Sequence, residues 1–123
     1  MIPASNDLAN RMPAWEALSS LFLDTDVSLD RDWRARTLAR SPYSMAEIEE
    51  ILTEEISPVC SWNLLSIAGE WAGFDPEWLR DSILWQVKRR PWLSPLGRKR
   101  VVKSREWRAT RELVERLRTE ENR

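Results

Sequence analysis

The predicted fold is decided by residues 58–72, which read PVCSWNLLSIAGEWA. Apolar side chains surround nearly the whole circumference of a helix built from this stretch, and the polar ones fall on one narrow stripe. A helix that is apolar on almost every side is normally buried inside a domain. We therefore predict an all-α fold, a compact bundle of about six helices packed around this buried central helix.

The other helices are predicted from the residues that start and stop them. Ser44 followed by Glu47 is a capping-box pattern, and Asp75 before a proline is a typical N-cap. Pro13 and Pro58 are each expected at a first helical position, with Pro58 also ending the helix before it. The expected helices cover residues 13–23, 30–40, 45–57, 58–72, 76–90 and 105–118.

Two of these helices have a recognisable pattern of faces. In the helix over 30–40, Trp33 and Thr37 recur at a helical interval, while Arg34, Arg36 and Arg40 form a basic side. In the helix after Ser104, the expected packing residues are Trp107, Thr110, Val114 and Leu117.

A chain of 123 residues is expected to form one domain, 1–123, with frayed ends at 1–12 and 119–123 and a basic loop at 91–103. Cys60 is the only cysteine, so no disulfide can form within the chain. The N-terminus has neither the basic start nor the apolar run of a signal peptide, and no apolar stretch reaches 18 residues. We therefore expect a cytoplasmic protein.

The charges are divided between two blocks, although the whole chain has a net charge of only −1. Residues 1–79 contain five cations and 14 acids, a net charge of −9, and residues 80–123 contain 14 cations and six acids, a net charge of +8. Such a split indicates either that the two blocks dock on each other or that at least one faces a charged partner.

Few residues suited to catalysis are present. The chain has no histidine, one cysteine and no nucleotide-binding, hydrolase or metalloprotease motif, so we expect no enzyme, no metal site and no cofactor. Carboxylates remain: Glu55 lies on an apolar arc, and a polar stripe runs through Asn63, Ser66 and Glu70. A buried pair of acids could exchange protons. Alternatively, each carboxylate meets an arginine of the 30–40 helix or a backbone amide, and this structural interpretation is favoured.

An acidic surface is the first candidate for partner binding. It combines the turn acids with three glutamates spaced along the 45–57 helix, namely Asp24, Asp26, Asp30, Asp32, Glu47, Glu50 and Glu54. Such a surface would complement a basic partner. The alternative is an ordinary solvated helix face.

A basic segment with interleaved tryptophan is the second candidate. Its candidate contact residues are Arg89, Arg90, Trp92, Arg98, Lys99 and Arg100. Basic and aromatic residues together are typical of nucleic-acid binding. A pI near 5.6 opposes that interpretation, because the rest of the molecule would repel phosphate, and favours docking of the segment on the acidic block.

Two stretches resemble a known group of proteins. They are RMPAWEALSSLFLDTD at residues 11–26, and residues 41–78, which begin with SPYS and end with NLLSIAGEWAGFDPEW. Both are similar to an uncharacterised family of small helical bacterial proteins that is associated with immunity proteins against secretion-system toxins. The resemblance implies a non-enzymatic cytoplasmic protein that binds a cognate toxin stoichiometrically. The rival function is that of a nucleic-acid-binding or adaptor protein acting through the basic segment. The sequence leaves the binding face and the oligomeric state open.

Overall fold

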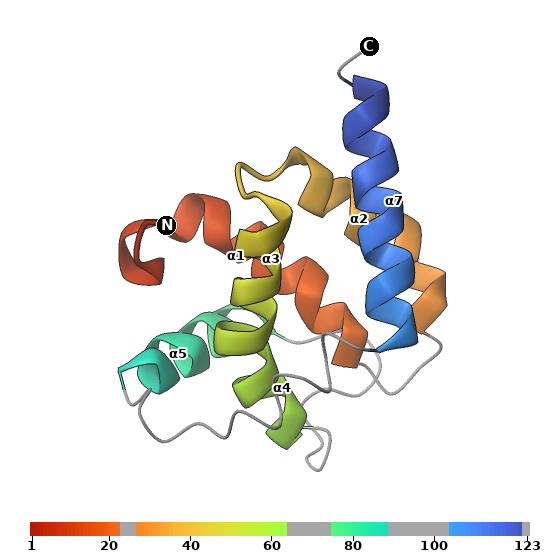
Figure 1. Cartoon of the computed structure of the whole chain (residues 1–123). Helices are drawn as coiled ribbons and strands as arrows, with labels where there is room; N and C mark the ends of the chain where they lie inside the picture. The colour runs from red at the N-terminus through yellow and green to blue at the C-terminus, as the bar shows by residue number, and fades with distance from the viewer. Residues whose placement is uncertain (23–26, 64–74, 89–103, 122–123) are drawn as a thin grey trace.

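A computed structural model of the chain describes residues 1–22, 27–63, 75–88 and 104–121, with the main chain only for 61–63 (Figure 1). Every regular element in these ranges is helical, which confirms the all-α prediction. The short elements are the 3₁₀ turns η1 (Ala4–Asn6), η2 (Ser20–Phe22) and η3 (Val27–Asp30) and the π-helical turn η4 (Leu52–Ile56). The α-helices are α1 (Leu8–Ser19), α2 (Arg31–Arg40), α3 (Met45–Ile51), α4 (Ser57–Asn63), α5 (Pro76–Val87) and α7 (Arg105–Glu121).

The first helix begins earlier than its proline predicts. α1 starts at Leu8 and contains Pro13 in its second turn, so the placement of Pro13 at the first helical position is wrong. The proline leaves the Ala9 carbonyl without its usual intrahelical donor. The turn before it is held by bonds of the buried Arg11 side chain, which donates to Asp7 at 2.9 Å within the turn and to Glu55 at 3.0 Å across the fold. Within residues 1–12, the 3₁₀ turn η1 and the first residues of α1 are helical.

The predicted break at Pro58 is also wrong. The Ser44–Glu47 capping box is present and starts α3 as expected, but α3, η4 and α4 then follow one another without interruption. In an α-helix, the ring of Pro58 would clash with the carbonyl four residues earlier. The wider π turn ends immediately before it, with the Ser57 amide donating to the Leu52 carbonyl. Such a turn lets a helix pass a proline with a local bend.

Two residues of α2 lie on the opposite side from the one expected. Arg34 is fully buried together with Ala35 and Leu38, whereas Trp33 is exposed. A guanidinium can be buried when it is paired and hydrogen-bonded, and every nitrogen of Arg34 donates in the contacts described below. Arg36 remains on the outside, as the basic side predicts.

The C-terminal elements follow the sequence pattern. Asp75 accepts a 2.9 Å hydrogen bond from the Trp78 amide and caps α5. α7 buries Trp107, Thr110 and Val114 and packs along α2, beside which it lies in Figure 1. The helix continues to Glu121, beyond the expected frayed end at 119. Arg118 fastens it to the end of α2 by donating to the main-chain carbonyls of residues 38, 39, 41 and 43, at 2.6 to 3.3 Å.

The described core is formed where α1, α2, η4, α5 and α7 meet. Its largest buried apolar side chains are Trp15, Leu18, Leu38, Ile48, Ile51, Leu52, Ile56, Leu79, Ile83 and Trp107. Val59 and Cys60 at the start of the predicted central helix are also buried. The rest of that helix, residues 64–72, lies outside the described residues. Within the described ranges, no helix has both the length and the apolar content needed to cross a bilayer.

Candidate functional site

A buried ionic cluster joins α1 to the π turn. Glu55 is 3% exposed and receives two parallel hydrogen bonds from Arg11, from Nε to Oε1 at 3.1 Å and from Nη2 to Oε2 at 3.0 Å. The indole Nε1 of Trp15 donates to the same Oε1 at 2.7 Å. Such bidentate pairing fixes both the position and the orientation of the carboxylate.

The opposite edge of Arg11 is bound just as firmly. Its Nη1 donates to the Ile2 carbonyl at 2.8 Å and to Asp7, and the guanidinium lies 5.4 Å from the centroid of the Tyr43 ring. Tyr43 donates its hydroxyl hydrogen to the same Asp7 carboxylate in a short contact. Burial and then this hydrogen bond raise the pKa of Tyr43 to about 12. The bond also lowers the pKa of Asp7.

This cluster decides between the two interpretations of Glu55. The carboxylate is buried in an ion pair, as the structural alternative predicts, but its arginine comes from α1 and not from the 30–40 helix. Burial alone would lower the pKa of Arg11, yet the hydrogen bond and the charge of Glu55 raise it. Both Glu55 oxygens are engaged by fixed donors, so the arrangement can hold α1 against η4 but offers no free carboxylate for proton exchange.

A second buried cluster lies between α2 and α7. Glu106 receives Nε and Nη2 of Arg31 at 2.7 and 2.8 Å and Nη1 of Arg34 at 3.2 Å. Arg34 also donates to the hydroxyls of Ser20 and Thr110, at 2.7 and 3.0 Å, and to the Val27 carbonyl at 2.8 Å. Three helical segments are thus tied to one guanidinium.

Glu106 and Arg34 both have lowered pKa values in this cluster. The hydrogen bonds from Arg31 lower the pKa of Glu106 despite its partial burial. Burial lowers the pKa of Arg34, and the charge of Glu106 only partly offsets that effect. Sequence reasoning missed both residues. The burial of Arg34 could have been predicted from its position on the same helical arc as Ala35 and Leu38.

α7 contacts both α3 and α2. On its α3 side, Glu49 accepts hydrogen bonds from Trp107 at 3.0 Å and from Arg111 at 2.9 Å. On its α2 side lie Arg31 and Arg34 with Glu106. The acids of α2 and those of α3 are therefore not placed on one continuous face by these contacts.

The individual acidic residues have different surroundings. Asp32 is exposed and forms an i, i+4 ion pair with Arg36 at 3.1 Å. Glu47 accepts the Ser44 amide at 2.9 Å, and this backbone bond lowers its pKa. Glu50 is exposed, and Asp30 and Glu54 are half-buried. Asp24 and Asp26 lie outside the described residues.

The remaining predicted site residues cannot be placed. The six residues of the basic segment and two members of the polar stripe, Ser66 and Glu70, lie outside the described ranges. Asn63 ends α4, and its side chain is not described. Among the described residues, no cluster of three or more acidic or cysteine side chains is arranged to hold a metal ion.

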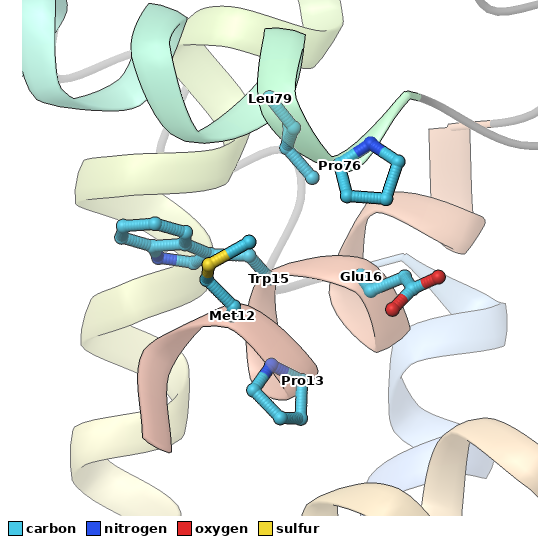
Figure 2. A pocket seen from close by; sticks show the side chains of 6 residues that line it. All are labelled: Met12, Pro13, Trp15, Glu16, Pro76 and Leu79. Atoms are coloured by element: carbon cyan, nitrogen blue, oxygen red, sulfur yellow. The ribbon is translucent and has the colours of Figure 1, made fainter. Parts of the chain in front are cut away.

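A small cleft lies between α1 and α5. Figure 2 shows Met12 and Trp15 of α1 on one side and Pro76 and Leu79 of α5 on the other, with Pro13 and Glu16 at the edge. Its volume is about 110 Å³, whereas pockets for small organic ligands usually measure about 300–1,000 Å³. The cleft is therefore too small for a substrate of ordinary size.

Comparison with known proteins places the chain in a family without assigning a role. No curated protein and no solved structure matches it. A family model described as a domain of unknown function, DUF7079, matches residues 9–120, a range that includes the pairs Arg11–Glu55 and Arg34–Glu106. This chain therefore belongs to the DUF7079 family.

Proposed function

We propose that this protein is a non-catalytic binding protein that neutralises a cognate bacterial toxin by direct stoichiometric binding. The resemblance to immunity proteins supplies the class of partner. The distribution of charge supplies the chemistry of the contact, because three of the five cations of the acidic block are bound in the ionic clusters while several of its acids face outward.

The observation that best supports this proposal is the position of the cations in residues 1–79. Arg11 and Arg34 are buried in the two ionic clusters, and Arg31 binds Glu106 through two donors, Nε and Nη2. Residues 1–79 contain only two further cations, Arg36 and Arg40. The acid-rich block therefore has few cations left to neutralise its surface.

The outer side of α3 is the favoured contact. Ile48 and Ile51 point into the core, which leaves the opposite side of α3, with the predicted contact residues Glu47 and Glu50, to meet a partner together with Glu54 of η4. Charges across such an interface chiefly increase the association rate and the specificity, and their effect falls with added salt. A toxin with a basic groove fits this chemistry.

The test is a charge reversal that spares the capping box. Glu50→Lys/Glu54→Lys changes the outer side of α3 and retains Glu47, whose carboxylate caps the helix. A matched control, Glu112→Lys/Glu120→Lys, makes the same change of charge on exposed positions of α7. Both proteins would be co-expressed with the toxin encoded beside this chain's gene, and binding would be measured by calorimetry at low and high salt.

The expected result is loss of protection and weaker, less salt-sensitive binding for the α3 variant alone. Equal protection by both variants would remove α3 from consideration and favour the basic segment around Trp92 as the contact. Absence of any complex with the unmodified protein would reject the immunity role itself.

A further inference from the structure

The outer side of α2 exposes apolar residues that the proposed function does not use. Leu29 is 79% exposed and Trp33 is 46% exposed. With Arg36 and Arg40 they are spaced by four, three and four residues, which places all four on one stripe along η3 and α2. Asp32 lies at the edge of this stripe, four residues before Arg36. We call these five residues the α2 stripe.

Charge changes sign along the α2 stripe. Its N-terminal half carries Asp32, its C-terminal half carries Arg36 and Arg40, and Trp33 lies between them. The side chains of Asp32 and Arg36 are 65% and 59% exposed, and their mutual ion pair lies at the surface. Exposed pairs of this kind contribute about 0–1 kcal/mol, so the partners can be exchanged at little cost.

A surface with these properties is complementary to itself. A two-fold axis brings the same patch of two copies together in opposite directions. Two α2 helices aligned in this way would place Asp32 of each copy near the arginines of the other, and Trp33 against the opposite Arg36. Parallel alignment would place like charges together. Tryptophan and arginine are also enriched among residues that dominate interface energies, and a guanidinium is attracted to the face of an indole ring.

We propose that the α2 stripe is the interface of a symmetric homodimer, with two α2 helices packed antiparallel across a two-fold axis. This proposal does not depend on the toxin-binding role, because it concerns α2 and leaves the outer side of α3 free. It also assigns Asp32 to self-association and not to the surface that binds a basic partner.

The interface is expected to be weak. One helix face buries less than the roughly 1,200 Å² of total area typical of stable complexes. Interfaces of about 1,600 Å² already extend to micromolar affinity, so this smaller contact should have a dissociation constant above about 1 µM. Measurements must therefore cover concentrations well above that value.

Sedimentation equilibrium of the full chain tests the proposal. The unmodified protein should approach twice its chain mass of 14.5 kDa as concentration rises. Arg36→Glu/Arg40→Glu makes the stripe wholly acidic, and Asp32→Lys makes it wholly basic. Each variant alone should remain monomeric, and an equimolar mixture of the two should form a heterodimer. Circular dichroism of each variant checks folding, which should be unchanged because all three positions are exposed.

Three results would overturn the proposal. They are a monomer at the highest soluble concentration of the unmodified protein, dimers formed by either variant alone, and failure of the mixture to associate while both variants remain folded. Glu112→Lys/Glu120→Lys serves as the control for net charge, since it should dimerise like the parent.

Discussion

Replacing Arg34 by methionine should strongly destabilise the protein. Methionine retains much of the apolar stem but none of the donors. The change would remove the donor that Arg34 supplies to Ser20, Thr110 and the Val27 carbonyl. Glu106 would lose one of its two arginines and keep Arg31.

The expected loss of unfolding free energy follows from the burial of Arg34. Arg34 has no exposed surface, and removing one member of a buried ion pair typically costs about 3–5 kcal/mol. The remaining pair between Glu106 and Arg31 makes the lower half of this range the expected value. A domain of this kind has a typical unfolding free energy of about 5–15 kcal/mol, so the variant would retain only part of it.

Urea unfolding supplies the measurement, and Arg36→Met supplies the matched control on the same helix. Arg36 is 59% exposed and pairs only with Asp32 at the surface, so its replacement should cost less than about 1 kcal/mol. With slopes of about 1–3 kcal/mol per molar urea, Arg34→Met should lower the midpoint by roughly 1–4 M. Similar midpoints for the two variants, with unchanged slopes, would refute the assignment of Arg34 as a structural centre.

Three further changes test the ionic clusters and the cap. Glu55→Gln should lower the unfolding free energy by about 3–5 kcal/mol in urea, whereas the exposed Glu50→Gln should have little effect, and equal losses would contradict the buried pairing. Ser44→Ala removes one half of the capping box and should cost about 1 kcal/mol, so a melting temperature identical to the parent would argue against the cap. The pKa of Glu106 is lowered in the fold, so its stabilisation is complete above its ordinary pKa of 4.5 and is lost as the pH falls toward the lowered value. The stability difference between Glu106→Gln and the parent should therefore shrink in acid, and a difference independent of pH would disprove this linkage.

Local patterns predicted those elements whose ends depend on neighbouring residues. The Ser44–Glu47 box and the Asp75 cap are formed by hydrogen bonds over three residues, so the sequence contains all the information they need. The packing face of α7 was likewise correct, because Trp107 and Val114 recur at a helical interval.

The two proline assignments failed because tertiary contacts overrode local preference. Pro13 suits a first helical position, but bonds between Arg11 and both Asp7 and Glu55 hold an additional turn before it. Pro58 suits a helix start equally well, yet the preceding π turn accommodates it inside a continuous helical segment. Contacts such as that between Arg11 and Glu55 join residues 44 positions apart and leave no local pattern in the sequence.

The burial of Arg34 likewise depends on a residue far along the sequence. A ranking by hydrophobicity places Trp33 inside and Arg34 outside, and the structure has the opposite arrangement. Burial of Arg34 requires Glu106, which lies 72 residues later and itself stands beside a tryptophan that was correctly predicted as core. Only the docking of α7 on α2 makes the buried guanidinium favourable.

The docking of α7 on α2 affects how the division of charge between the two blocks is interpreted. If the two blocks simply neutralised each other, the cations of α7 would pair with acids of the first block, as Arg111 does with Glu49. The ion pairs between α2 and α7 have the opposite arrangement. Here the acid, Glu106, comes from the basic block, and the cations, Arg31 and Arg34, come from the acidic block. The docking of α7 therefore binds cations of the acidic block, which has only five of them. Internal packing and a charged partner are therefore complementary explanations of the charge pattern, and the function proposed above assigns a basic partner to the outer side of α3.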